Sequence, residues 1–288
     1  MPISPGTVSK ILWHFTGGPR WNEKEQRQEN QPKPIDDACA ALVSILRSRE
    51  LRIGQYKEVV KVIVPYVNEC DPTTLKISKR YNVPLTIVSA PVCCLADIPI
   101  MHLGYHAERY GKIAIGFHRD AVIRHGFSPV FYQLDRSAVL QAIYSGFGAT
   151  KLSELCDLEQ EVATLRKNIE TVKCKEGHPA EVDTMSLFYD LEGLANAGNS
   201  IMSHPKKGFE NFVAYVKSFE PEEFETIYCE REWRSTKPFN FEFSDISMVV
   251  VPRNVDSGDH YERFVHDTRS IGLPKTVSIV AWDDLVEH

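Results

Sequence analysis

The chain has 288 residues, of which 43% are hydrophobic and 25% are charged, and its formal net charge at pH 7 is −6. This length allows one large or two small domains with a sizeable core, and the composition is that of an ordinary globular protein. The negative charge argues against a nucleic-acid-binding surface that covers the whole protein, although it leaves room for a local basic cleft.

Nothing in the sequence indicates secretion, a membrane span or a disulfide framework. No apolar run approaches the ~20 residues that a spanning helix needs, and the first residues lack the basic and apolar regions of a signal peptide. The seven cysteines are an odd number and include no C-x-x-C pair, which disfavours paired disulfides and a zinc knuckle. We therefore expect a cytoplasmic protein with reduced thiols and no membrane partner.

The N-terminal part begins with a strand pattern and continues with a helix pattern. An apolar, aromatic run at residues 10–16, closed by two glycines and a proline, predicts a strand that ends in a turn. Residues 36–51 begin with acidic residues, carry apolar residues at helical spacing and have basic residues near their end, which predicts a helix. The polar segment 19–35 between them predicts a flexible flap, because long polar segments beside a site strand are more often mobile or functional than packed.

The next part predicts strands and helices in alternation. The β-branched runs 61–67 and 84–89 predict strands, and the turn-forming residues between them predict a loop. Segment 93–99 leads into a predicted helix at 100–110, which Asp97 or its neighbours are placed to cap. A strand at 110–118, a short helical segment at 119–125 and a strand at 129–132 follow.

Two histidines on the predicted helix raise the question of a metal site. His102 and His106 lie four residues apart and so share one helix face. Residue 103 is leucine, however, whereas the H-E-x-x-H zinc motif has glutamate there, and no third ligand is evident nearby. We therefore predict no metal site.

The second half changes to a helical pattern and then returns to strands. From residue 134 to about residue 220 the apolar spacing predicts a helical insertion between two β-rich halves. Strands are then predicted at 224–234, 239–243 and 247–251, a helix at 261–270 and a last strand at 276–282. We therefore predict the α+β fold class, with residues 1–288 forming a single domain on a mixed β-sheet.

The segment Tyr228–Arg234 places charged side chains among aromatic ones in a predicted strand. In an extended strand, Glu230 and Glu232 stand side by side on one face, together with the two end residues. Like charges repel and burial raises a carboxyl pKa, so such a pair persists only if it is paired, solvated or used in chemistry. An edge strand whose Glu and Arg side chains face water explains the same residues.

Five short motifs occur in order along the chain. They are Trp13-His-Phe-Thr16, Cys94-Leu-Ala-Asp-Ile-Pro99, Tyr110-Gly-Lys-Ile-Ala-Ile-Gly-Phe117, Gly126-Phe-Ser-Pro-Val-Phe-Tyr132 and Glu230-Arg-Glu-Trp-Arg234. Together they span most of the chain, and the series resembles the AbiGi-type abortive phage-infection family. The resemblance implies a bacterial phage-defence or toxin–antitoxin context, in which members have been labelled antitoxins, and it implies no particular chemistry.

A more distant resemblance bears on chemistry. An aromatic-flanked histidine on a first strand and a Glu-x-Glu on a late strand resemble the ADP-ribosyltransferases, in which His, an aromatic residue and Glu surround NAD. The resemblance implies a sheet of ADP-ribosyltransferase-like type and NAD as a substrate, with Tyr66, Tyr105 and Tyr110 as candidates for the aromatic position. The residues implied are Glu232 as the catalytic carboxylate, Glu230 as the residue that orients or deprotonates the acceptor, His14 as the ribose-binding residue, and Phe15, Thr16, Tyr110 and Arg234 beside the NAD.

The chemistry of NAD cleavage suits these residue types. Breaking the nicotinamide–ribose bond passes through an oxocarbenium-like cation, which a fixed carboxylate stabilises. A histidine binds ribose hydroxyls, and an aromatic ring stacks on nicotinamide. The hypothesis requires His14 and Glu232 to lie on neighbouring strands and to face one cleft.

Three classes of function remain open from the sequence. The first is an ADP-ribosyltransferase-like toxin or effector of phage defence that modifies a macromolecular acceptor, either a protein or a nucleic acid. The second is a non-catalytic antitoxin or partner-binding protein of an abortive-infection system, with a cognate toxin as its partner. The third is a nuclease or other hydrolase. Such an enzyme requires a metal ion, and the potential metal ligands in the sequence are poorly spaced for one.

Overall fold

A computed structural model describes residues 9–22, 24–25, 27–29, 31–70, 77–134, 137–143, 208–223, 227, 230–255 and 258–286. The chain divides into two compact units. The first comprises residues 1–58, 90–132 and 214–288, and the second comprises residues 59–89 and 133–213. The helices predicted between residues 144 and 207 lie outside the described residues.

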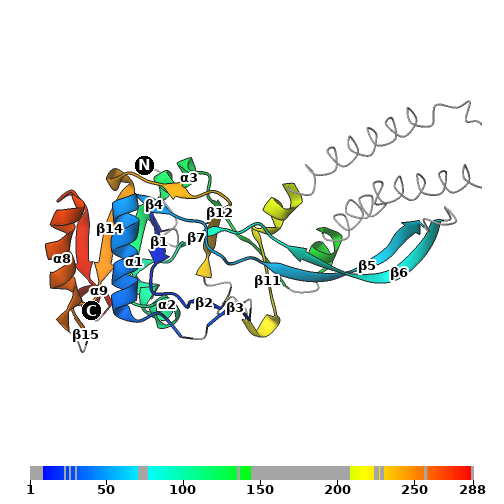
Figure 1. The fold of residues 1–288 in the computed structure, drawn as a ribbon, viewed down its shortest axis with the longest axis horizontal. Coiled ribbons are helices and arrows are strands. Elements are labelled where there is room, and N and C mark those ends of the chain that lie inside the picture. Colours follow the sequence, from blue (N-terminus) through cyan, green and yellow to red (C-terminus); the bar gives the residue numbers. More distant parts are fainter. Residues whose placement is uncertain are drawn as a thin grey trace, which may run out of the picture. The chain divides into compact units, whose positions relative to one another are not determined.

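A seven-stranded sheet forms the centre of the first unit (Figure 1). From one edge to the other its strands are β17 (Ser278–Ala281), β14 (Ile246–Val251), β8 (Ala114–His118), β1 (Ile11–Phe15), β7 (Cys93–Ala96), β12 (Glu232–Ser235) and β9 (Ser128–Pro129). β14 and β17 are parallel, whereas the other neighbouring pairs are antiparallel. The protein is therefore α+β with a sheet of mixed orientation, as the sequence predicts.

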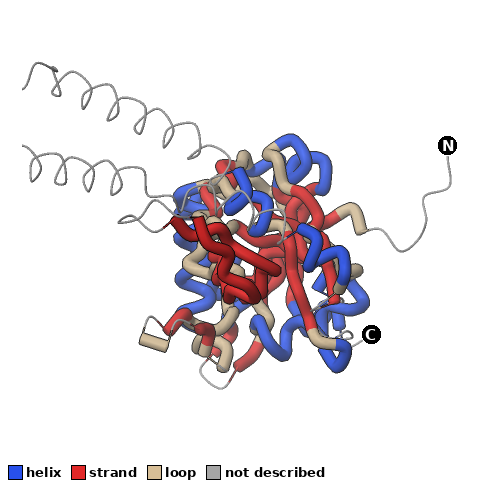
Figure 2. Tube along the Cα trace, turned by 90° about the vertical axis from the view of Figure 1, so that its right-hand side faces the viewer, coloured by secondary structure: helices blue, strands red, loops and turns tan. Residues whose placement is uncertain are grey.

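Helices surround the strands of this sheet (Figure 2). They are α1 (Ile35–Ser48), η1 (Ile100–His102), α2 (Leu103–Tyr110), α3 (Arg119–Arg124), η2 (Pro221–Glu223), η4 (Phe243–Asp245), α8 (His260–Ile271) and α9 (Trp282–Val286). The unit also contains the short paired strands β2 (Trp21–Asn22) and β3 (Arg27–Gln28), β4 (Glu50–Leu51) and β13 (Phe239–Asn240), and β15 (Asn254–Val255) and β16 (Gly258–Asp259). A further pair joins β11 (Val216–Phe219) to β10 (Phe131–Leu134), whose last two residues belong to the second unit.

Each face of the sheet packs against its own apolar cluster. Leu12 of β1 packs with residues of α1, α3 and α8, including Leu42 and Phe264. The next residue, Trp13, packs with residues of α2 and α9, including Trp282. Successive side chains of a strand point to opposite faces, so both faces of β1 are buried, and this explains why its sequence is apolar without alternation.

Several predicted elements are confirmed with small shifts of their ends. The strand at 10–16 is β1, the helix at 36–51 is α1, the helix at 100–110 is η1 with α2, and the helix at 261–270 is α8. These segments carry strong patterns: α1, for example, has two acidic residues in its first turn and Arg47 in its last. Within the predicted flap 19–35, the chain forms the short β2–β3 hairpin.

The prediction for segment 93–99 misses a central strand. Cys93–Ala96 forms β7, which lies between β1 and β12 in the sheet. Asp97 does not cap the following helix, because the N-cap is Pro99, with no side-chain cap. The Asp97 carboxylate instead accepts hydrogen bonds from Arg119 and Arg231.

The second unit contains a long two-stranded ribbon. β5 (Val59–Cys70) and β6 (Ile77–Val88) pair along their length, so much of the predicted loop between the two β-branched runs is strand. Pro65 and Asn82 stand opposite each other without pairing, because proline has no N–H and Asn82 has a φ of 52°. A described helical segment at 138–143 falls in the predicted insertion.

Candidate functional site

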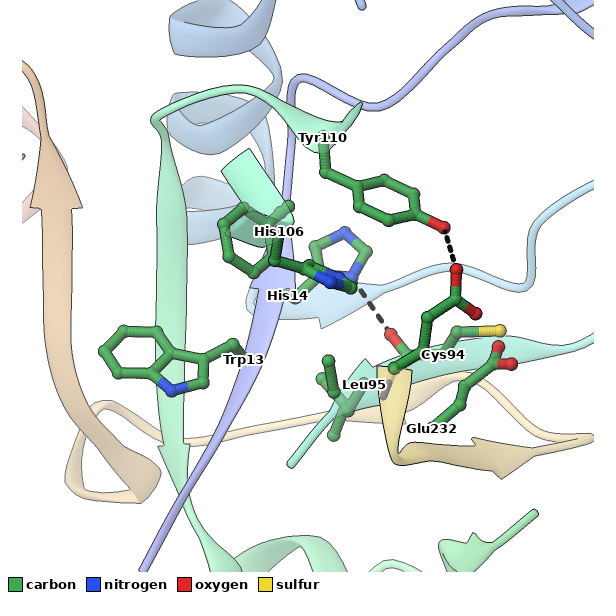
Figure 3. Close-up of a pocket in the computed structure, with 10 residues that line it drawn as sticks. Trp13, His14, Cys94, Leu95, His106, Tyr110 and Glu232 are labelled. Carbon is green, nitrogen blue, oxygen red and sulfur yellow. Dashed lines mark hydrogen bonds between the residues drawn. The ribbon is translucent and has the colours of Figure 1, made fainter. Parts of the chain in front are cut away.

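A pocket of the first unit lies beside β1, β7, α2 and the start of β12. It encloses about 480 Å³ of empty space, part of which is open to solvent. Figure 3 shows that His14, Tyr110 and Glu232 reach it from different elements. The residues that line it are Trp13, His14, Phe15, Cys94, Leu95, Ala96, His106, Tyr110, Glu230 and Glu232.

His14 is a neutral hydrogen-bond acceptor toward this pocket. Its Nδ1 lies 3.2 Å from the backbone oxygen of Cys94, on the adjacent strand β7 (Figure 3). A carbonyl oxygen only accepts, so Nδ1 carries the proton and Nε2 is the acceptor. Burial lowers the pKa of His14, and the bond to Cys94 only partly offsets this effect. Trp13, the neighbour of His14 on β1, anchors this strand. Its buried Nε1–H donates a hydrogen bond of 3.0 Å to the backbone oxygen of Ile98.

Aromatic rings form one wall of the pocket. The His106 ring stacks on Tyr110 with centroids 4.4 Å apart and lies 4.9 Å from the ring of Phe15. The two α2 residues are four apart and therefore share one helix face. Two glycines fix the end of α2: Gly111 has a φ of 78°, and a Cβ on Gly17 would lie 2.8 Å from the backbone oxygen of Tyr110.

Glu230 is buried and accepts three hydrogen bonds. Its carboxylate lies 2.7 Å from Lys217 Nζ, 3.1 Å from the Tyr110 hydroxyl and 3.2 Å from Arg109 Nη1. Lys217 is also nearly buried, whereas half of the Arg109 side chain is exposed. The carboxylate is thus held by one buried cation, one solvated cation and a phenol. A buried charge requires such ion pairs and hydrogen bonds to offset the loss of hydration.

Glu232 forms a second buried ion-pair system. Its Oε2 lies 2.7 Å from Arg234 Nη2 and 3.4 Å from Lys217 Nζ. Burial by itself raises the pKa of the Glu232 carboxyl, but Arg234 and Lys217 outweigh it and lower the pKa to about 2. Arg234 in turn binds the carboxylate of Glu58 at 2.7 Å and donates to the backbone oxygen of Ala214 at 2.8 Å.

The two glutamates do not share a strand, and this corrects the prediction for Tyr228–Arg234. β12 begins at Glu232, Glu230 lies in a 3-10 turn, and Arg231 between them has a φ of 43°. Asp97 supports this left-handed residue, because its N–H donates to the Arg231 backbone oxygen at 3.1 Å and its carboxylate binds the Arg231 side chain at 3.2 Å. A left-handed non-glycine residue costs about 1–3 kcal/mol and is commonly found at functional sites.

The predicted site residues are brought together only in part. His14 and Glu232 line one pocket, but their strands are not neighbours as predicted, because β7 lies between them. Thr16 is buried with its hydroxyl donating to the Ala38 backbone oxygen, and neither Thr16 nor Arg234 lines the pocket. Phe15, Tyr110 and Glu230 do line it. Of the other candidate tyrosines, Tyr105 is exposed and Tyr66 belongs to the second unit.

Several residues at the site escape the sequence interpretation. His106 carries a usable signal, because it lies one turn from Tyr110 on a predicted helix. Cys94 lines the pocket from the missed strand β7. Tyr132 ends a predicted strand, but neither it nor Lys217 carries a signal of a role at the site, because the pairing of their strands β10 and β11 depends on contacts far apart in sequence.

The neutral state of His106 predicts a pH-dependent stability. Burial is the largest effect and lowers the pKa of His106 from 6.5 to about 4. Between these two values the unfolded chain binds more protons, so stability is full above pH 6.5 and falls as the pH drops toward 4, by about 2–4 kcal/mol. Denaturant titrations at pH 7 and pH 4.5 measure this loss. His106→Phe should reduce it, whereas replacement of the exposed His102 by phenylalanine should not; equal losses in all three proteins would contradict the assignment.

Comparison with known proteins assigns the family. Residues 60–264, well over half of the chain, match the family described as "Putative abortive phage resistance protein AbiGi, antitoxin". The chain belongs to the AbiGi family. The resemblance predicted from the five motifs is thereby confirmed. The range matched by the AbiGi family includes Glu230 and Glu232, whereas His14 lies before it.

A curated AbiGi protein supports the same assignment over a shorter stretch. The "Abortive phage resistance protein AbiGi" of Lactococcus lactis subsp. cremoris is 43% identical over 63 residues, which cover 20% of this chain and 25% of that protein. The match therefore spans about a quarter of the length of this relative. No solved structure matches the chain, so the ADP-ribosyltransferase-like type of sheet stays a prediction.

Among the described residues, no helix is long and apolar enough to cross a membrane. Within the same ranges, no group of three or more His, Cys, Asp or Glu side chains is arranged to hold a metal ion.

Proposed function

We propose that this AbiGi-family protein acts in abortive phage infection as an antitoxin that binds a cognate toxin. The observation that carries the proposal is the match of residues 60–264 to a family described as an antitoxin. An antitoxin of this kind needs a surface that recognises another macromolecule. The proposal therefore places the main function in binding and does not require catalysis.

The β5–β6 ribbon supports a binding function. Val59, Ile63, Val88 and Tyr81 are 56%, 62%, 43% and 65% exposed. Val59 and Val88 are cross-strand partners, and Ile63 shares their face of the ribbon. Exposed apolar side chains gathered on one element are typical of macromolecular interfaces. This ribbon begins at residue 59 and so lies almost entirely within the matched range.

Growth rescue tests the antitoxin function. The product of the gene beside this one is expressed in a bacterial host, with and without this protein, and growth is followed. The proposal expects the neighbouring product to arrest growth alone and growth to resume when both are present. Ile63→Glu together with Val88→Glu should weaken the rescue, because charges on the exposed apolar face oppose burial in an interface.

ADP-ribosyl transfer from NAD is a second candidate function. The convergence of His14, Tyr110, Glu230 and Glu232 on one pocket is the specific observation that favours it. The pocket fits the nicotinamide riboside part of NAD in three respects. The Nε2 of His14 accepts from a ribose hydroxyl, the rings of the aromatic wall provide a stacking surface, and Glu232 supplies a carboxylate for the cationic transition state.

The cations around Glu232 make ADP-ribosyl transfer the second candidate. The charge of Glu232 is compensated by Arg234 and Lys217, and both contacts weaken its attraction for a developing cation. In this second function the transferred group would pass to a macromolecular acceptor, either a protein or a nucleic acid. Incubation of the purified protein with labelled NAD and cell extract, with release of nicotinamide as a second readout, tests it.

A further inference from the structure

Lys217 occupies a central position among the charges of the pocket. Its Nζ lies 2.7 Å from a carboxylate oxygen of Glu230 and 3.4 Å from one of Glu232. Only 13% of the Lys217 side chain is exposed. Burial by itself lowers the pKa of this lysine, but the two carboxylates outweigh it and raise the pKa well above its usual value. Lys217 is therefore a charged, buried bridge between the two glutamates.

The β10–β11 strand pair, which carries Lys217, makes a second contact with residues 230–232. β11 pairs with β10, and the hydroxyl of Tyr132 on β10 accepts a hydrogen bond of 2.7 Å from the Glu232 backbone N–H. In the sequence, β10 lies just before residues 135–215 and β11 lies just after them. The contacts of Tyr132 and Lys217 with the glutamates therefore come from the two ends of this stretch. The β10–β11 pair thus holds the backbone at Glu232 through Tyr132 and pairs with both glutamate carboxylates through Lys217.

Two carboxylates that meet at one buried cation have a simple electrostatic consequence. Without the cation, like charges at this distance disfavour double ionisation, and the pair retains a proton to higher pH. Among the described residues, the other titratable or charged groups that face the pair or Lys217 include Arg234, Arg109, Tyr110, His106, Cys94, Tyr132 and Tyr56. Arg234 contacts Glu232, and Arg109, which is half exposed, contacts Glu230, so within the described part of the chain Lys217 is the buried cation that contacts both.

We propose that Lys217 is a positioning residue that holds the carboxylates of Glu230 and Glu232 side by side at the pocket, and that the β10–β11 strand pair places it there. The pocket then presents fixed acceptors, namely two carboxylates and the Nε2 of His14, which suit a ligand rich in hydroxyl or N–H donors. This role concerns the pocket of the second candidate function, but it rests on the contacts of Lys217 alone and is independent of NAD and of a toxin.

Carboxyl-carbon NMR titration of protein with labelled glutamate tests the proposal without any ligand. In the wild-type protein we expect Glu232 to titrate with a pKa of about 2. Lys217→Met should raise this pKa by about 1 to 3 pH units, because the shared cation is lost. Lys217→Arg, which keeps the charge, should hold it close to the wild-type value. Replacement of Lys237 by methionine is the matched control, because Lys237 is exposed and contacts neither glutamate.

A double variant separates the proposed role from a general loss of structure. Adding Glu230→Gln to Lys217→Met removes the repulsion between the carboxylates, so the Glu232 pKa should fall back toward the wild-type value. An unchanged Glu232 pKa in folded Lys217→Met would overturn the proposal. If Lys217→Met does not fold, Glu230→Gln in the Lys217→Arg protein decides: a further drop of the Glu232 pKa supports the repulsion between the pair, and no change contradicts it.

Discussion

Arg234→Met is expected to lower the free energy of unfolding by about 3–5 kcal/mol, which is the usual loss when one partner of a buried ion pair is removed. The Arg234 side chain is fully buried between the carboxylates of Glu58 and Glu232, which are both nearly buried. Methionine fills a similar volume but leaves both carboxylates without this cation. The loss should therefore reflect the removed ion pairs more than lost packing.

Denaturant unfolding at pH 7, followed by circular dichroism, measures the effect of Arg234→Met. Arg49→Met is a matched control, because Arg49 pairs with Glu242 at 3.0 Å while both side chains are more than half exposed. Exposed pairs contribute about 0–1 kcal/mol, so the control should lose little. Similar small losses for both variants would show that the charges around Arg234 are solvated in the folded protein.

Glu232→Gln should abolish both NAD hydrolysis and ADP-ribosyl transfer if the second candidate function holds. A carboxylate beside the ribose stabilises the cation in every reaction of NAD, so its loss should lower the rate by about 10²–10³. Glu230→Gln should mainly impair transfer, because that residue is assigned to the acceptor. Turnover of NAD is measured alone and with acceptor for the wild type and both variants.

Each glutamate variant also removes a partner of Lys217, so folding must be checked beside turnover. Circular dichroism and unfolding curves at the assay pH serve this purpose, and Glu222→Gln, at an exposed position of η2, is the control. Wild-type protein that is inert toward NAD in both assays would end the transferase hypothesis. The antitoxin function would then stand without it.

Elements with strong local patterns were predictable from the sequence. α1 has an amphipathic repeat with charges that match the helix dipole, and β1 is a compact apolar run closed by glycines. β7 is only four residues long and lies between β1 and β12, and three of its four residues are buried, so nothing local marks it as a strand. Short strands of this kind are specified by their neighbours in the sheet.

In the candidate site, likewise, the residues were predictable from the sequence but their arrangement was not. His14, Tyr110, Glu230 and Glu232 were predicted from residue types and a family resemblance, and they do line one pocket. Their exact arrangement depends on the left-handed conformation of Arg231, which tertiary contacts with Asp97 support. Lys217 falls within the predicted helical insertion, whereas it lies on the strand β11, which exists because it pairs with β10 from far away in the sequence.

Growth of a bacterial host on induction of the neighbouring gene product tests the antitoxin function most directly. Host cells carry that gene alone, with the wild-type protein, with the Ile63→Glu and Val88→Glu double variant, or with Glu232→Gln. We predict growth arrest in the first case, rescue by the wild type and by any folded Glu232→Gln protein, and weaker rescue by the double variant. Arrest that persists in the presence of folded wild-type protein would contradict the proposed function.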